Sequence, residues 1–204
     1  SFYIIDKFFR SFVSGFCHII KVSQYVENDN HPFQTNEISH SRVILNLYLL
    51  RHAKSSWESY EDDHDRVLSE RGRNDASTLG EYLHKNNINF ENTLCSSSQR
   101  TRETISIINE VSPHSISEIN YLDSLYHASS NKMKEIIKNH TNKSLLIVGH
   151  NPGISELISD LLKSNLIDYP TCVFAQFNLI SQDVAKAEAQ MIIRPKNKKI
   201  INLL

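Results

Sequence analysis

Residues 47–52, Leu-Tyr-Leu-Leu-Arg-His, place the strongest constraint on how this chain can fold. A short apolar run ends abruptly in an arginine and a histidine. A run of this length fits a strand that is buried on both faces, as in a parallel sheet covered by helices. In open α/β sheets, ligands bind where the strands reach their carboxyl ends. Arg51 and His52 therefore stand where chemistry is expected.

Predicted strands and helices alternate from Val43 onward, a pattern that favours an α/β fold. The sequence predicts strands over 47–50, 93–95, 116–122, 144–148, 173–180 and 189–193, and helices over 70–86, 99–110, 133–137 and 154–162. Ser69 is the expected N-cap of the first helix, and Asn151 with Pro152 the N-cap and first helical position of the last. These elements predict a three-layer α/β/α sandwich with a mainly parallel sheet.

Composition narrows the class of protein. With 40% hydrophobic and 22% charged residues, the chain is typical of a soluble globular protein. Its 204 residues are enough for one domain of ordinary size and an additional segment. The net charge of −1 provides no general attraction to nucleic acid or anionic lipid, so an anion site has to be a local cluster. Cys17, Cys95 and Cys172 lack the spacing of a zinc site or a disulfide framework, which favours a reducing compartment and predicts the cytoplasm. The sequence has no run of 18 apolar residues, so no transmembrane helix is expected.

The first 43 residues differ from the rest and are predicted to be an extension and linker, with the domain over 44–204. Five of the nine phenylalanines fall within the first 16 positions, and the apolar residues recur at helical spacing with basic residues between them. One interpretation is an amphipathic helix that contacts a membrane surface or directs the chain to an organelle. The alternative is a helix packed on the surface of the domain itself.

Three predicted strand-to-helix junctions carry polar residues: 51–52, 98–100 and 149–151. Parallel strands bring such junctions to one edge of a sheet. Helix N-termini attract anions, and Arg51 and Arg100 add planar forks that hold phosphate oxygens in pairs. With His52 and His150, they predict a pocket for a doubly charged tetrahedral anion.

The residues at these junctions also resemble a known family. The three motifs are Leu-Leu-Arg51-His52-Ala, Ser-Ser-Gln-Arg100-Thr-Arg-Glu-Thr and Val-Gly-His150-Asn-Pro-Gly, and in this order they resemble the histidine phosphatase superfamily. The segments 54–57 (Lys-Ser-Ser-Trp), 65–72 (Asp-Arg-Val-Leu-Ser-Glu-Arg-Gly) and 125–128 (Leu-Tyr-His-Ala) are similar to its SixA-type phosphohistidine phosphatases. The resemblance covers about residues 44–180 and implies a phosphoglycerate-mutase-like fold. One departure is Ala53, where the wider superfamily usually has glycine.

The resemblance implies a two-step mechanism in which neutral His52 attacks phosphorus and water then hydrolyses the phosphohistidine. A hydrogen bond from the second ring nitrogen to a backbone carbonyl would hold His52 in the required tautomer. Arg51, Arg100 and a protonated His150 would neutralise the phosphoryl oxygens. Arg66 resembles an additional substrate-binding arginine, and Asn151 is a further substrate-binding candidate. Arg102, two residues beyond Arg100, is assigned to the surface.

The proton donor is the least determined part of the predicted site. Asp123 is the candidate for a general acid by its position in the chain, and an exposed turn residue is the equal alternative. Ser96 to Ser98 are interpreted as helix-capping residues. The remaining histidines are interpreted as surface residues, with His127 at the pocket mouth as a minor alternative, and no metal site or cofactor is expected.

The predicted function is a metal-independent phosphatase acting on protein phosphohistidine. About forty residues separate the second helix from the strand at Ser144, which leaves no room for a helical cap and favours a phosphate presented on a protein surface. One alternative is a phosphatase of small phosphoesters, and another is a non-catalytic phosphate-binding module. Expected partners are a phosphorylated protein or a small phosphoester, with no nucleic acid and no membrane span.

Overall fold

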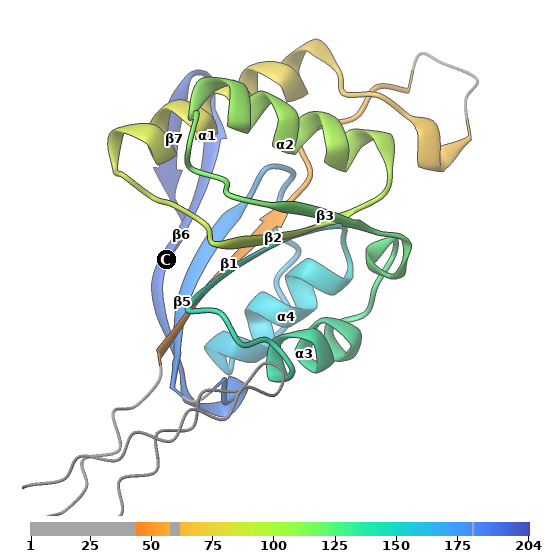
Figure 1. Cartoon of the computed structure of the whole chain (residues 1–204). Helices are drawn as coiled ribbons and strands as arrows, with labels where there is room; N and C mark the ends of the chain where they lie inside the picture. Colours follow the sequence, from red (N-terminus) through yellow and green to blue (C-terminus); the bar gives the residue numbers. More distant parts are fainter. Residues whose placement is uncertain (1–43, 58–61, 181) are drawn as a thin grey trace, which may run out of the picture. The chain divides into compact units, whose positions relative to one another are not determined.

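The computed structural model describes residues 44–57, 62–180 and 182–204 (Figure 1). The predictions for residues 1–43, an extension and linker with an amphipathic helix, lie outside the described residues. Within the described part of the chain, no helix is long and apolar enough to cross a membrane.

A seven-stranded mixed sheet forms the middle layer, in the order β3-β2-β4-β1-β5-β6-β7. Its strands are β1 (Ile44–Arg51), β2 (Asn92–Ser96), β3 (Ile119–Leu122), β4 (Ser144–Gly149), β5 (Phe174–Ile180), β6 (Ala187–Lys196) and β7 (Lys199–Asn202). The first four strands pair in parallel, and β5, β6 and β7 add an antiparallel extension beside β1. The α/β sandwich is confirmed. The sheet is mixed and not mainly parallel as predicted, because the parallel strands β3, β2, β4 and β1 form one side of it and three of its six strand pairings are antiparallel.

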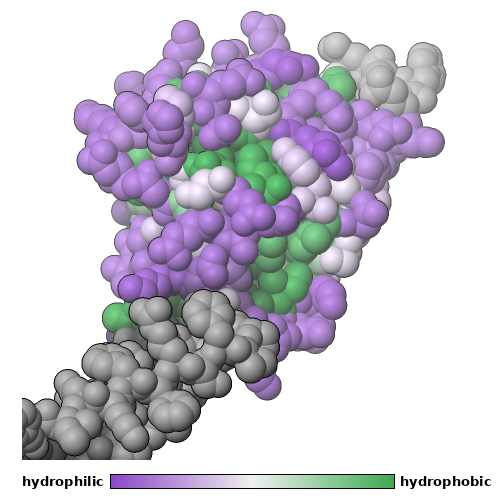
Figure 2. Space-filling model, viewed as in Figure 1, coloured by the Kyte–Doolittle hydropathy of each residue, from purple (hydrophilic) through white to green (hydrophobic). Residues whose placement is uncertain are grey.

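Helices cover both faces of the sheet. They are α1 (Glu70–Lys85), α2 (Gln99–Val111), α3 (Ser130–Lys138) and α4 (Gly153–Leu162), with short 3₁₀ segments η1 (Asp63–Asp65), η2 (Asp123–Leu125) and η3 (Val184–Lys186). Helices α1 and α2 lie together on one face, while α3 and α4 lie together on the other (Figure 1). The outer surface in the same view is mostly hydrophilic, with some apolar patches (Figure 2).

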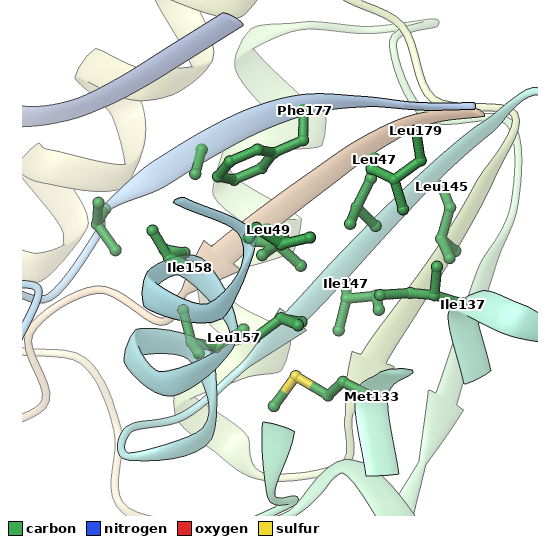
Figure 3. Close-up of a cluster of buried hydrophobic side chains, with 14 of the residues drawn as sticks. Leu47, Leu49, Met133, Ile137, Leu145, Ile147, Leu157, Ile158, Phe177 and Leu179 are labelled. Carbon is green, nitrogen blue, oxygen red and sulfur yellow. The ribbon is translucent and has the colours of Figure 1, made fainter. Parts of the chain in front are cut away.

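Strand β1 is buried from both sides, as its apolar sequence predicts. Leu47 and Leu49 belong to the cluster beneath α3 and α4, whereas Tyr48 and Leu50 belong to the cluster beneath α1 and α2. Figure 3 shows the first of these clusters. In it, strand side chains such as Leu47 and Leu49 lie beside the apolar side chains that α3 and α4 contribute to the same core. Burial on both faces fixes this strand, and with it the position of the two residues at its carboxyl end.

The predicted helix starts have different outcomes. Ser69 caps α1 as expected, because its hydroxyl accepts a hydrogen bond from the Gly72 N–H (3.1 Å). The prediction for α4 is wrong by one position: the helix begins at Gly153 with Pro152 as its N-cap residue, and the Asn151 side chain does not cap it. A Cβ at Gly153 would lie 1.9 Å from the Ala128 carbonyl oxygen, so only glycine permits this approach.

Strand boundaries at the sheet edges also differ from expectation. The predicted strand 116–122 is shortened to β3, and the final edge strand β7 was not anticipated. Both are short edge strands of mixed polarity, so their sequences carry a weak alternation signal.

Candidate active site

The three polar junctions lie side by side at the carboxyl edge of the parallel strands, as the sequence predicts. Arg51 of β1 pairs with Gly149 of β4, and Cys95 of β2 pairs with Val148 of β4. The segments that follow these strands therefore emerge at one edge. His52, His150 and the first turn of α2 meet there.

His52 is held in one orientation and one tautomer. Its Nδ1 donates a hydrogen bond to the Ala53 carbonyl oxygen (2.7 Å), so the proton resides on Nδ1 and Nε2 keeps its lone pair. The residue is only 8% exposed. Burial, followed by the positive charges of Arg100, Arg51 and Arg66, lowers the pKa of His52 to about 3. The imidazole is therefore neutral at physiological pH.

The backbone around His52 is anchored on every side. The His52 N–H donates to the Gly149 carbonyl (3.0 Å), and its carbonyl accepts from the Cys172 N–H (3.0 Å). The fully buried Ala53 donates its N–H to the hydroxyl of Thr104 on α2 (3.0 Å). Alanine is therefore accommodated where the wider superfamily usually has glycine, and the nucleophile candidate sits on a rigid segment.

His150 faces His52, with ring centroids 5.0 Å apart. Its Nε2 shares a hydrogen bond with the Ser96 hydroxyl (2.8 Å), while its buried Nδ1 has no partner within the described chain. Burial, then electrostatic interaction with His52, Arg100 and His127, lowers the pKa of His150 to about 2. The expected protonation of His150 is therefore wrong in this structure, because the surrounding cations and the low exposure disfavour another positive charge.

The serines at the end of β2 and at the start of α2 differ from their predicted role. Ser98 is the N-cap residue of α2, but its hydroxyl bonds the Thr101 hydroxyl (2.9 Å) instead of capping a backbone N–H, and it lies 3.4 Å from His150 Nε2. The Ser96 hydroxyl bonds His150. These two serines position side chains of the site.

Two predicted arginines lie within electrostatic reach of His52, one at the end of β1 and one in the first turn of α2. Arg51 donates to the Tyr169 carbonyl (2.5 Å) and lies 3.8 Å from the exposed Asp168 carboxylate. Arg100 is 3% exposed and directs its guanidinium at Asp63, where it donates to both the carbonyl and the carboxylate. Arg102, in contrast, lies on the surface, as expected.

Arg66 is part of the same site, although it lies in a loop. It is 8% exposed and donates to the Ser55 hydroxyl (2.7 Å) and to the Asp63 carboxylate (2.9 Å). The Trp57 ring covers its guanidinium at 3.4 Å from the ring centroid. Its charge contributes to the lowered pKa of His52, which places it within electrostatic reach of the nucleophile candidate.

Asp63 is the carboxylate that sequence reasoning missed. Besides Arg66 and Arg100 (both 2.9 Å), it accepts a hydrogen bond from the Tyr126 hydroxyl (2.7 Å) and lies 3.5 Å from His127 Nε2. The hydrogen bond from Tyr126, followed by those from the two arginines, holds the pKa of Asp63 well below its usual range. The Asp63 carboxylate therefore binds the same hydrogen-bond donors, Arg66 and Arg100, that could hold an anionic ligand. The sequence offers one indication of this role: Asp63 lies in a polar segment, three residues before the predicted substrate-binding Arg66.

Two predicted site residues take other positions. Asp123 is exposed in η2, and within the described chain its carboxyl has no hydrogen bond or ion pair; its backbone carbonyl accepts the Tyr126 N–H. Asn151 directs its amide away from helix α4, toward the Asp168 carboxylate and the Tyr169 carbonyl (3.1 Å). It therefore braces the loop that also holds Arg51.

The rim of the site adds aromatic and imidazole groups. The Tyr126 ring lies 5.5 Å from that of His150, and the exposed His127 ring also lies 5.5 Å from His150, so both residues border the site. His64, interpreted from the sequence as a surface residue, lies 3.1 Å from the Ser97 hydroxyl and 5.0 Å from the Tyr126 ring. It therefore belongs to the same rim.

No cluster of three or more His, Cys, Asp or Glu side chains suited to a metal occurs among residues 44–57, 62–180 and 182–204. Three guanidinium groups gather at the site instead: Arg51, Arg66 and Arg100. Together with the lone pair of His52 Nε2, they form a cationic cradle beside a neutral nucleophile.

Comparison with known proteins gives a consistent result. Residues 47–125 match the family model described as "Histidine phosphatase superfamily (branch 1)". An uncharacterized protein of Mycobacterium leprae is 37% identical over 112 residues, which are 52% of this chain and 66% of that protein. An uncharacterized chloroplastic protein of Arabidopsis thaliana is 32% identical over 141 residues, 64% of each chain. The chain thus spans just under two thirds of the length of these relatives.

Solved structures show the same fold. A protein of Agrobacterium tumefaciens, assigned as the phosphohistidine phosphatase SixA, has a TM-score of 0.67 and 26% identity, over 74% of this chain and 98% of that one. A phosphoglycerate mutase of Bacillus anthracis has a TM-score of 0.57 and 16% identity, over 73% and 92% of the two chains. The phosphoglycerate-mutase-like fold predicted from the motifs is confirmed.

Proposed function

We propose that this chain, whose residues 47–125 match the histidine phosphatase superfamily, is a phosphatase in which His52 carries the phosphoryl group between two substitution steps. The observation that carries this proposal is the tautomer of His52. A neutral imidazole with its proton on Nδ1 presents the lone pair of Nε2 beside three guanidinium groups. A site that only bound phosphate would have no need for a nucleophile held in this way.

Binding begins with an exchange of anions. The phosphoryl group displaces the Asp63 carboxylate from Arg66 and Arg100, which then hold its oxygens with forked, charge-assisted hydrogen bonds. Because the arginines are already assembled around a carboxylate, little reorganisation accompanies the exchange.

In the first step, His52 Nε2 bonds to phosphorus while the bond from phosphorus to the leaving group breaks. The leaving group departs with the bonding electron pair, and His52 becomes a positively charged phosphohistidine stabilised by the hydrogen bond to Ala53 O. In the second step, water attacks phosphorus and releases a proton to solvent, which balances the proton that the leaving group takes up. The P–N bond breaks and the electron pair returns to Nε2. Orthophosphate and a neutral His52 result, so the cycle closes.

His150 supplies a further contact. If the Ser96 hydroxyl donates to Nε2 of the neutral ring, the proton of His150 lies on the buried Nδ1, which has no partner in the described chain. That N–H is then free to donate to a phosphoryl oxygen. A bound dianion also raises the pKa of His150, since a nearby negative charge favours the imidazolium form.

The substrate class that fits best is a phosphohistidine on a protein. The Asp63 carboxylate, with its pKa below the usual range, is ionised near pH 7 and is a poor proton donor. An imidazole leaving group, with an ordinary pKa of about 6.5, needs less protonation than an alkoxide does. The short connection from α2 to β4, occupied by β3, η2 and α3, contains no helical cap over the described site.

The test compares kcat/KM for a phosphohistidine-bearing protein with kcat/KM for an alkyl phosphate and an aryl phosphate. The proposal predicts the highest value for phosphohistidine and loss of all three activities in His52→Ala. A preference for the alkyl phosphate would replace the substrate class with a small phosphoester. Activity that persists in His52→Ala would overturn the proposal itself.

The compartment is proposed to be the cytoplasm, or an organelle reached through residues 1–43. Cys95 and Cys172 are free and buried, which suits a reducing compartment. Expressing residues 1–43 and residues 44–204 as separate fluorescent fusions tests which segment determines location.

A further inference from the structure

A second cationic pocket lies on the same edge of the sheet as the candidate active site. It has a volume of about 520 Å³ and is lined by the N-terminal part of α1 and by the end of β6 with the turn that follows. The lining residues are Arg71, Asn74, Asp75, Arg194, Lys196, Asn197 and Lys198. Nothing in the proposed phosphatase mechanism uses them.

The charge of this pocket is strongly unbalanced for a chain whose net charge is only −1. Four cationic side chains line it against one carboxylate, so its net charge is +3. The single acid, Asp75, is buried and already paired with Arg71 at 3.5 Å. Lys196 and Lys198 are exposed and have no ion pair within the described chain. Three cations therefore lack a dedicated counter-ion.

Arg194 provides a second, independent observation. Its Nε is buried and has no hydrogen-bond partner among the described residues. Buried polar atoms are nearly always paired, and leaving a buried donor unpaired is costly. Arg194 also lines the pocket, and an oxyanion there is the kind of ligand that pairs with a guanidinium group.

The pocket is placed close to His52 by the register of the sheet. Leu50 of β1 pairs with Phe174 of β5, and Phe174 pairs with Ile193 of β6, so these three residues lie side by side across the sheet. Arg51 and Arg194 are the next residues of β1 and β6. Strands β1 and β6 run in the same direction with β5 between them, and adjacent strands lie about 4.8 Å apart, so the Arg51 and Arg194 backbones are roughly 10 Å apart.

Helix α1 is fastened to the segment that follows the nucleophile candidate. The Ser69 N–H donates to the Lys54 carbonyl (2.9 Å), and a Cβ at Gly72 would lie 2.1 Å from that carbonyl oxygen. Cys172, whose N–H bonds the His52 carbonyl, also lies within electrostatic reach of Asp75 and Arg194. Helix α1, which lines the pocket, is therefore in direct contact with the segment that follows His52.

We propose that this pocket, lined by Arg71, Arg194, Lys196 and Lys198, is a second anion subsite that binds a multiply charged phosphate group. Its volume is in the range of small-molecule sites, and its polar, cationic lining suits phosphate oxygens better than an apolar ligand. The phosphate comes either from a separate phosphorylated molecule or from a second phosphate on the substrate, at the spacing of the two pockets.

The binding test uses inorganic pyrophosphate and the whole chain in isothermal titration calorimetry. Wild type should bind two pyrophosphates, one at Arg66 and Arg100 and one in the second pocket. The pocket variant carries three substitutions, Arg194→Gln, Lys196→Gln and Lys198→Gln. It should bind the second pyrophosphate roughly tenfold or more weakly, because charge-assisted hydrogen bonds are lost. Lys85→Gln/Lys138→Gln/Lys143→Gln removes three charges elsewhere on the surface and should keep both events. A single event in wild type that the pocket variant retains, or two unchanged events in the pocket variant, overturns the proposal.

Kinetics then identify the source of the phosphate. If it belongs to the substrate, the pocket variant raises KM for a bisphosphate and leaves KM for a monophosphate unchanged. If it belongs to a separate molecule, pyrophosphate adds a noncompetitive component to its competitive inhibition of wild type with a monophosphate substrate, and the pocket variant keeps only the competitive component. The calorimetric result does not depend on turnover, so failure of this subsite and failure of the proposed phosphatase activity are distinguishable.

Discussion

Replacing Asp63 with asparagine should make the active site bind orthophosphate more tightly. In the structure the Asp63 carboxylate lies on the same guanidinium groups, Arg66 and Arg100, that are proposed to hold the phosphoryl group. An incoming phosphate competes with this internal anion. Asp63→Asn keeps the shape of the side chain and an acceptor for the Tyr126 hydroxyl, and it removes the charge.

The expected size of the effect follows from the exposure of the carboxylate. Hydrogen bonds to charged groups contribute about 1.5–3 kcal/mol when shielded from water. The Asp63 side chain is 47% exposed, however, so solvent screens its pairs with Arg66 (10% exposed) and Arg100 (4% exposed). Discounted for this screening, the competition amounts to about 1 kcal/mol, which corresponds to roughly fivefold tighter binding.

The assay is the competitive inhibition constant of orthophosphate against an aryl phosphate substrate, since competition reports the active site and not the second pocket. Asp123→Asn is the matched control, because it removes the same charge from an exposed residue without a partner in the described chain. We expect the inhibition constant to fall in Asp63→Asn and to stay at the wild-type value in Asp123→Asn.

Two outcomes would refute this reasoning. An unchanged or weaker inhibition constant in Asp63→Asn, with folding intact, would mean that Asp63 does not compete with phosphate. An equal decrease in both variants would mean that the effect is one of overall charge and not of the contacts with Arg66 and Arg100.

Further predictions concern pH, metals and the N-terminal segment. The Tm of the phosphate-free protein should fall as the pH drops from about 6.5 to about 4, because burial holds the pKa of His52 at about 3 and that of His150 at about 2, while an unfolded histidine titrates near 6.5. His52→Gln/His150→Gln should show a shallower dependence, and an identical slope would contradict the assignment of two buried neutral histidines. Extensive chelation should leave kcat unchanged, and a loss restored by one added metal would contradict the account of charge neutralisation by arginines. A chain beginning at Ser41 should fold and retain kcat, whereas a folded but inactive product would mean that the preceding residues complete the site.

The residues at strand ends were the predictable part of the site. Arg51, His52 and His150 could be placed together from the sequence, because the topology of parallel strands brings their carboxyl ends to one edge. Burial of β1 on both faces determines where His52 lies. A hydrogen bond from the His52 ring to a backbone carbonyl is also predicted, and the structure identifies that carbonyl as the one of Ala53.

Residues in loops were not predictable by the same argument. Asp63 contacts Arg100, 37 positions away in the sequence, and Tyr126, 63 positions away. Loops bring these residues together, and hydrophobic periodicity does not predict the path of a loop. Asp123 was chosen for its position along the chain, but the 3₁₀ segment η2 leaves it exposed while placing Tyr126 in the site. The protonation state of His150 likewise does not follow from the sequence, because burial and neighbouring cations are properties of the assembled site.

The most direct test of the central claim is the identification of a phosphorylated enzyme. Rapid quenching during turnover of a radiolabelled phosphoryl substrate should trap label on the protein that is stable in alkali and labile in acid, as expected of a P–N bond, and peptide mapping should locate it at His52. The His52→Ala protein should carry no label. Label that persists in His52→Ala, or acid-stable label of the phosphoserine type, would contradict the account.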